Sequence, residues 1–102
     1  MKLLTDELRQ RLPPLYSQEA EGDPVVYAKF HLPGTSRAWY AMEGEPRGED
    51  YLFSGFVAGP NEFRQFRLSE LEAVRGLFDA RVERDLTFTE GRLTDVVPAP
   101  DS

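Results

Sequence analysis

The sequence predicts an α+β protein in which a mostly antiparallel meander of about five strands carries two packed helices. Three observations support this prediction. Segments of alternating apolar and polar residues recur along the chain, as is typical of half-buried strands. Short turn-forming segments separate most of them, which favours pairing between strands that are neighbours in sequence. Helix-start signals occur before the first strand and after the fourth, so the expected element order is α-β-β-β-β-α-β.

The first helix is expected to begin after Thr5, whose hydroxyl makes it a good N-cap. Asp6 and Glu7 follow in the first turn, where negative charge complements the helix dipole. The helix ends before Pro13 after about two turns, and so short a helix depends on packing its apolar side chains. Those side chains share one face: Leu4, Leu8 and Leu12. Residues 17–24 carry turn and charge signals and predict a loop.

Four strands of the meander are expected at residues 25–32, 37–43, 51–58 and 62–68. The first strand has one continuous apolar face and one face with polar side chains. The apolar face contains Val26, Ala28, Phe30 and Leu32, and the other contains Lys29 and His31. The third strand is apolar on both faces, which indicates a central strand covered on both sides. Residues 44–50, which are acidic and contain Gly and Pro, predict a loop.

The second helix has the clearest start signal, because Ser69 and Glu72 have the spacing of a capping box. Its inward-facing side chains are expected to be Leu71 and Val74, with Leu77 or Phe78 as further candidates. Residues 82–88 alternate again and predict a fifth strand with Val82, Leu86 and Phe88 on one face. Residues 1–96 are therefore expected to form one domain, and the proline-containing residues 97–102 a flexible tail.

Composition excludes several classes of function. The 102-residue chain has no cysteine, which rules out disulfides, thiolate zinc sites, iron–sulfur clusters and cysteine nucleophiles. Its formal charge of −6 is spread evenly over both halves, which disfavours strong binding to a phosphate backbone. The acidic start of the chain and the lack of an apolar run of about 20 residues predict a cytoplasmic protein without a membrane span.

Several segments together suggest a family. They are MKLLT (1–5), LPPLYSQE (12–19), WYAMEG (39–44), LSELEAVRG (68–76) and VERDLTF (82–88). In these segments, and over nearly its whole length, the chain resembles the DUF2958 family of small bacterial proteins. This resemblance implies a plasmid or mobile-element setting and supplies no catalytic residues.

Acidic residues form one group of candidates. Glu43, Glu45, Glu49 and Asp50 are expected in a single loop, where carboxylates either stay solvated or hold a hard cation. Their spacing matches no EF-hand loop, so a solvated loop and no metal site are expected. Joined by Glu19, Glu21 and Asp23, the same group offers an acidic face that attracts a basic partner or imitates nucleic-acid phosphates. The single histidine, His31, is expected to be a sheet-face residue.

Aromatic and guanidinium side chains form a second group. Arg37, Trp39, Tyr40, Phe63 and Arg64 offer a stacking platform for single-stranded nucleic acid, although strand aromatics usually belong to the core. In a regular strand Phe63 and Phe66 fall on opposite faces.

These observations favour a non-enzymatic accessory protein that binds another protein through an exposed sheet face or edge around Trp39 to Glu43. The alternative is a nucleic-acid-associated protein, either a weak single-strand binder or an acidic DNA mimic. A small carboxylate-dependent hydrolase is the third hypothesis. Neither a cofactor nor a catalytic residue is expected from the sequence.

Overall fold

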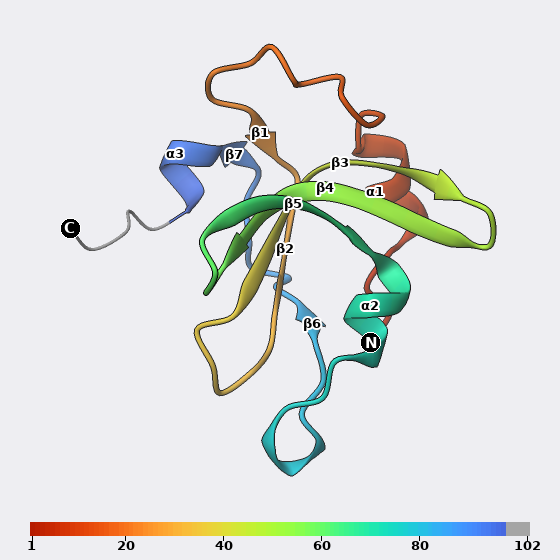
Figure 1. Ribbon diagram of the computed structural model, residues 1–102, viewed down its shortest axis with the longest axis vertical. Coiled ribbons are helices and arrows are strands. Elements are labelled where there is room, and N and C mark those ends of the chain that lie inside the picture. The colour runs from red at the N-terminus through yellow and green to blue at the C-terminus, as the bar shows by residue number, and fades with distance from the viewer. Residues whose placement is uncertain (98–102) are drawn as a thin grey trace.

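The computed structural model describes residues 1–97. Its helices and strands are α1 (Asp6–Arg11), β1 (Val25–Val26), β2 (Ala28–His31), β3 (Ala38–Arg47), β4 (Asp50–Ala58), β5 (Glu62–Arg67), α2 (Leu68–Ala73), the 3₁₀ turn η1 (Leu77–Asp79), β6 (Glu83–Arg84), β7 (Gly91–Arg92) and α3 (Leu93–Val96). Five strands form an antiparallel sheet in the order β5-β4-β3-β2-β6, and β1 pairs with β7 in a second, two-stranded sheet (Figure 1). The predicted α+β class and the antiparallel meander are therefore confirmed.

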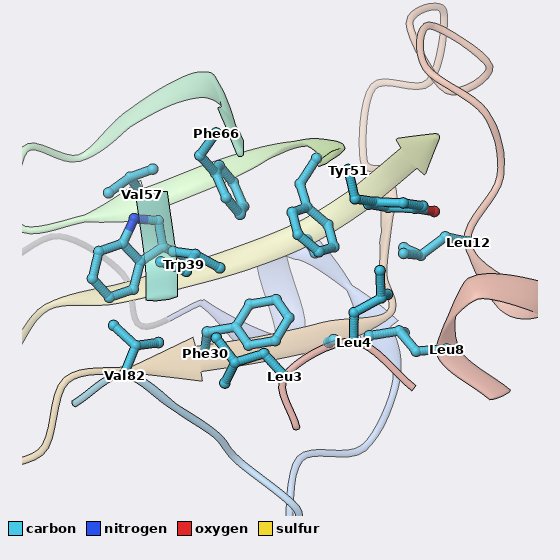
Figure 2. Packing of buried hydrophobic residues seen from close by; sticks show 14 of the residues in the cluster. Leu3, Leu4, Leu8, Leu12, Phe30, Trp39, Tyr51, Val57, Phe66 and Val82 are labelled. Atoms are coloured by element: carbon cyan, nitrogen blue, oxygen red, sulfur yellow. The ribbon is translucent and has the colours of Figure 1, made fainter. Parts of the chain in front are cut away.

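One face of the large sheet, which we call the packed face, carries the main hydrophobic core (Figure 2). The ring of Phe53 is fully buried, and its centroid lies 5.5 Å from that of Phe30 and 5.4 Å from that of Phe66. Both α1 and α2 cover this face, because Leu8 and Leu71 belong to the same core cluster. Burying such side chains stabilises the fold by about 1.5–3 kcal/mol each.

The first helix forms as predicted. The Thr5 hydroxyl oxygen accepts a hydrogen bond from the Leu8 N–H at 3.2 Å, which satisfies one of the free donors at the start of α1. Leu4, Leu8 and Leu12 are all buried in the core of the packed face. The helix ends before Pro13, so its stability comes from docking these leucines on the sheet.

The predicted loop at residues 44–50 is wrong, because β3 and β4 continue through it as a hairpin. Their register extends to the Arg47–Asp50 pair, so only two residues form the turn. Gly48 occupies this turn with a φ of +63°, a conformation that glycine adopts without steric cost. Four of the residues expected in a loop therefore belong to a strand, β3.

The predicted first strand, residues 25–32, breaks at Tyr27. The Tyr27 N–H donates to the Ala41 carbonyl at 2.9 Å, while β1 turns away to pair with β7. Val26 consequently belongs to a second cluster with Tyr40 and does not share the face of Ala28. This second cluster lies on the other side of the sheet, which we call the open face. Lys29, Tyr40, Phe56 and Phe63 point to the open face, which residues 88–97 cover only in part.

The second helix begins two residues earlier than predicted. The Glu70 carboxylate accepts a hydrogen bond from the Arg67 N–H at 3.3 Å, so Arg67 is the N-cap residue. The capping box predicted for Ser69 and Glu72 is wrong, because Asp50 takes both donors of Ser69. Its carboxylate accepts from the Ser69 hydroxyl at 2.6 Å and from the Ser69 N–H at 3.2 Å. The hydrogen bonds from Ser69 to Asp50 of β4 therefore outweigh the capping-box pattern in the local sequence.

Leu77 and Phe78 do not face the core. They are 84% and 102% exposed at the tip of a narrow loop whose base is closed by an antiparallel bridge between Arg75 and Arg81. Phe78 has a φ of +57°, in the left-handed region that costs an ordinary L-residue about 1–2 kcal/mol. The loop thus holds an aromatic residue in a strained backbone conformation without burying its side chain.

Phe78→Asn is expected to raise the free energy of unfolding by about 0.5–1 kcal/mol, because asparagine tolerates this conformation and the ring has no packing to lose. The midpoint of urea unfolding measures the effect. Leu77→Asn is the matched control, since Leu77 is also largely exposed but has no positive φ. An equal gain in both variants would show that surface polarity, and not backbone strain, is the cause.

The predicted fifth strand is shorter than residues 82–88. Only Glu83 and Arg84 pair with β2, at the edge of the sheet. Val82 is buried in the core as predicted, whereas Leu86 is 75% exposed. Phe88 packs on the open face, where its ring centroid lies 6.4 Å from that of Tyr40.

The C-terminal part contains two elements that the sequence did not predict, β7 and α3. They follow Glu90 directly and pack on the open face through Leu93 and Val96. Val97, which was expected in the tail, donates its N–H to the Leu93 carbonyl at 3.0 Å and joins the same cluster. The rest of the predicted tail, residues 98–102, lies outside the described residues. Within residues 1–97, no helix is long and apolar enough to cross a membrane.

Candidate functional site

The surface predicted around Trp39 to Glu43 is buried. Trp39, Tyr40 and Glu43 are only 4%, 2% and 5% exposed. The reason is the sheet order, because β3 lies between β2 and β4 and therefore has no free edge. Figure 2 shows the Trp39 indole in the core with Val57 and Val82. The prediction that this segment forms an exposed sheet face or edge is wrong.

The sheet also separates the predicted aromatic and guanidinium residues. The strand registers place Trp39 and Arg64 on the side of the packed face, and Tyr40 and Phe63 on the open face. Arg64 lies 3.9 Å from Glu62, whereas the Arg37 guanidinium lies 5.2 Å from the centre of the Trp39 ring. These residues therefore do not form the predicted stacking platform together.

The carboxylates of Glu43 and Glu45 hold a neighbouring segment of the chain in place. The two oxygens of Glu43 accept hydrogen bonds from the N–H groups of Tyr16 and Gln18, at 2.9 and 2.7 Å. Glu45 accepts one from the Leu15 N–H at 3.1 Å. Because hydrogen bonds to a charged acceptor are strong, these contacts fix residues 15–18 across β3. Both carboxylates have a structural role here.

The other two carboxylates of the predicted group point elsewhere. Asp50 binds Ser69 at the start of α2, and Glu49 is exposed in the β3–β4 turn. In residues 1–97 no three acidic or histidine side chains lie close enough together to hold a metal ion. Asp23 is also engaged, since it accepts hydrogen bonds from the hydroxyl and N–H of Thr94 in α3, at 2.7 and 3.0 Å.

The contacts of Asp50 predict a pH dependence of stability. Hydrogen bonds from the Ser69 hydroxyl, then from the Tyr51 N–H, lower the pKa of Asp50 below its ordinary value. A lowered pKa in the folded state stabilises the fold above the ordinary aspartate pKa of about 3.9, and this contribution is lost as the pH falls through the lowered value. We therefore expect the stability difference between wild type and Asp50→Asn to shrink in acid.

Urea unfolding between about pH 3 and pH 7 measures this difference. Ser69→Ala removes the hydrogen bond that lowers the pKa of Asp50 most. The stability of this variant is therefore expected to depend less on pH than that of wild type. A constant difference between wild type and Asp50→Asn over the whole range would contradict this assignment.

The open face instead presents a row of aromatic side chains that crosses the sheet. Ring centroids are 5.3 Å apart for Phe63 and Phe56, 6.5 Å for Phe56 and Tyr40, and 6.4 Å for Tyr40 and Phe88. We call these four residues the aromatic row. Its outer end is exposed, because 61% of Phe63 is accessible to solvent. Near this end Tyr16 is 65% exposed, and its hydroxyl accepts a hydrogen bond from Gln65 at 3.1 Å.

Two grooves border the aromatic row. The larger, of about 710 Å³, is lined by cationic and polar side chains with Tyr40 and Phe56, and we call it the basic groove. Its cationic or titratable lining residues are Lys29, His31, Arg37 and Asp85. The smaller, of about 360 Å³, lies at Phe63 and contains Glu19, Glu21 and Glu43. The lining of the first groove thus mixes cations with one carboxylate, whereas the charged residues of the second are all acidic.

The aromatic row ends at β5, the outermost strand of the sheet. The strand contains six residues, of which only Phe66 is buried. An outermost strand leaves one row of backbone N–H and C=O groups without a partner strand, and such edges accept an added strand readily.

The residues that sequence reasoning missed here are Phe56 and Tyr16. The only usable signal was the expected placement of Phe63 and Phe66 on opposite faces, which is confirmed.

These features define a small antiparallel α+β protein with one packed sheet face and one open, aromatic sheet face. The chain belongs to the DUF2958 family, because the family model, described as a protein of unknown function, matches residues 3–98. The resemblance found in the sequence is therefore confirmed. Neither a curated protein nor a solved structure gives a match to the chain.

Proposed function

We propose that this protein is a non-enzymatic accessory protein that binds another protein through the outer end of the aromatic row and the adjoining edge strand β5. It works in the cytoplasm, in the plasmid or mobile-element setting that the family resemblance implies. The observation that carries the proposal is the exposed ring of Phe63, which continues into the half-buried ring of Phe56.

An exposed aromatic pair favours a protein partner for two reasons. Contiguous apolar surface in contact with water is unfavourable and marks interaction sites, where aromatic residues are enriched. The Phe63 end of the row also borders Glu19 and Glu21, which repel the phosphates of a nucleic acid. The partner segment is therefore expected to combine an apolar side chain with basic residues.

The open edge of β5 supplies a second means of binding. An extended partner segment that pairs with β5 gains main-chain hydrogen bonds, while pockets next to the strand select its side chains. The acidic groove beside Phe63 is such a pocket, because Met42 and Tyr16 also line it. Backbone pairing gives affinity in this arrangement, and the groove gives specificity.

The experiment is a pull-down with tagged protein from a lysate of the source organism, carried out with and without nuclease. Wild type is expected to retain a stoichiometric protein partner after nuclease treatment, and Phe63→Ser is expected to lose it. Phe78→Ser is the matched control, because it removes an even more exposed phenylalanine that lies in η1 and not in the sheet. Circular dichroism verifies that both variants are folded.

Retention of the partner by Phe63→Ser, or its loss in Phe78→Ser alone, would contradict the proposed surface. Partners that vanish after nuclease treatment would contradict direct protein binding and favour nucleic acid.

A further inference from the structure

We propose that two copies of this chain pair through their β5 strands, antiparallel and about a two-fold axis at Phe63, so that their large sheets join into one. The pairing covers the edge that the proposed function assigns to another protein, so the second copy and that partner exclude each other. This regulation of the surface rests on the proposed function, whereas the pairing itself does not.

The edge strand β5 is open to pairing along its length. Its residues, Glu62–Arg67, include no proline, and their register with β4 has no shift. Prolines and bulges are two of the features by which proteins protect an edge strand. Charged side chains are a third, so the arrangement of the charges on β5 decides whether a second β5 can lie beside it.

The symmetry of such a dimer limits which residues of β5 face each other. A two-fold axis normal to the sheet makes the two strands antiparallel and keeps both open faces on the same side. Residues directly opposite each other then share a face. Phe63 lies on the open face, whereas Glu62 and Arg64 lie on the other side, because Glu62 pairs with the core residue Val57. The axis therefore passes beside one residue of β5, which faces its own copy.

The charges of β5 favour an axis at Phe63. Glu62 of each copy then faces Arg64 of the other, which gives two ion pairs. Directly opposite Cβ atoms are about 4.5–5.5 Å apart, whereas alternate residues of one strand are about 6.6 Å apart. The contact between Glu62 and Arg64 within one chain is accordingly long, at 3.9 Å. An axis at Arg64 would place two arginines opposite each other, and one at Gln65 would form no directly opposite ion pair.

The same axis brings the two Phe63 rings together on the open face. Phe63 is 61% exposed, and its ring already packs edge-on against Phe56 with the centroids 5.3 Å apart. Opposite aromatic residues stabilise antiparallel strand pairs, and the second ring would cover the exposed end of the aromatic row. The two aromatic rows would then run continuously across the joined sheet. Charge and apolar contact therefore favour the same register.

Sedimentation velocity of the purified protein tests the pairing. Wild type is expected to change from monomer to dimer between about 1 and 500 μM, because one strand pair is a small interface. Glu62→Arg and Arg64→Glu are each expected to raise the dissociation constant about tenfold or more, because both ion pairs become pairs of like charges. Arg81→Glu is the matched control, since it makes the same charge change at an exposed arginine outside β5. It is expected to change the dissociation constant by less than about twofold.

An equimolar mixture of Glu62→Arg and Arg64→Glu tests the register itself. One variant then has two cations and the other has two carboxylates at the facing positions, so a mixed dimer regains both ion pairs. Its dissociation constant is expected to lie within about threefold of the wild-type value. Circular dichroism verifies that each variant is folded.

Wild type that stays monomeric at the highest concentration would overturn the pairing, and so would single variants that dimerise as well as the control. A mixture that stays monomeric would show that Glu62 and Arg64 do not face each other. These measurements use the purified chain alone, so their failure leaves the pull-down result unaffected, and the reverse also holds. In cells, a crosslink from position 63 to a second copy gives an adduct of twice the mass of the chain, which distinguishes it from a crosslink to another protein.

Discussion

Gly55→Ala is expected to lower the free energy of unfolding by about 3 kcal/mol or more. A Cβ atom at position 55 would lie 1.8 Å from the Tyr40 carbonyl oxygen and 3.2 Å from the Ala41 Cα. Both atoms belong to the backbone of β3, so no side-chain rotation relieves the clash. The two strands must separate at the pair formed by Ala41 and Gly55, beside the irregularity in β3.

Urea unfolding followed by circular dichroism measures this loss. Gly22→Ala is the matched control, because no atom lies within 4 Å of its Cβ position and its φ is not positive. The control is expected to change stability by less than about 0.5 kcal/mol. Equal unfolding midpoints for Gly55→Ala and wild type would contradict the close approach of β3 and β4.

Glu43→Ala is expected to destabilise the fold by about 3 kcal/mol. The substitution leaves the N–H groups of Tyr16 and Gln18 without their acceptor in a site where Glu43 is only 5% exposed. It also disturbs the Gln18 side chain, whose amide group bonds to both backbone groups of Val25 and to the Met42 carbonyl. Residues 15–18 would therefore detach from β3 before the rest of the sheet unfolds.

Chemical denaturation gives the global loss, and hydrogen exchange at the Tyr16 and Gln18 amides gives the local one. Both amides are expected to exchange faster in Glu43→Ala than in wild type. Glu49→Ala is the matched control, since this carboxylate is exposed in the β3–β4 turn. If Glu43→Ala had no more effect than Glu49→Ala, the structural role of Glu43 would be wrong.

Much of the fold was predictable because its signals are local. The cap at Thr5, the prolines after Leu12 and the apolar run of β4 each act within a few residues. The hairpin of β3 and β4 was not predictable in this way. Gly44 and Pro46 indicate a loop in the sequence, yet cross-strand pairing with Phe53 and Tyr51 keeps both in a strand.

The candidate site was harder to predict, because burial depends on the order of the strands and on one irregularity. A regular alternation from Trp39 and Ala41 would place Glu43 on the packed face. The register shifts between Ala41 and Glu43, so Glu43 instead pairs with Ser54 and reaches Tyr16 on the other side. The periodicity of the sequence does not indicate this shift. The candidate site residues, which were chosen by the chemistry of their side chains, are therefore mostly residues that stabilise the fold.

The central claim is that the outer end of the aromatic row contacts a protein partner. Photo-crosslinking in cells of the source organism tests it most directly, with a photoreactive phenylalanine analogue at position 63 or, as the control, at position 78. Both positions are exposed, but only position 63 lies on the open face. We expect a discrete protein adduct from position 63 and none from position 78. No adduct from position 63, or the same adduct from both positions, would contradict the claim.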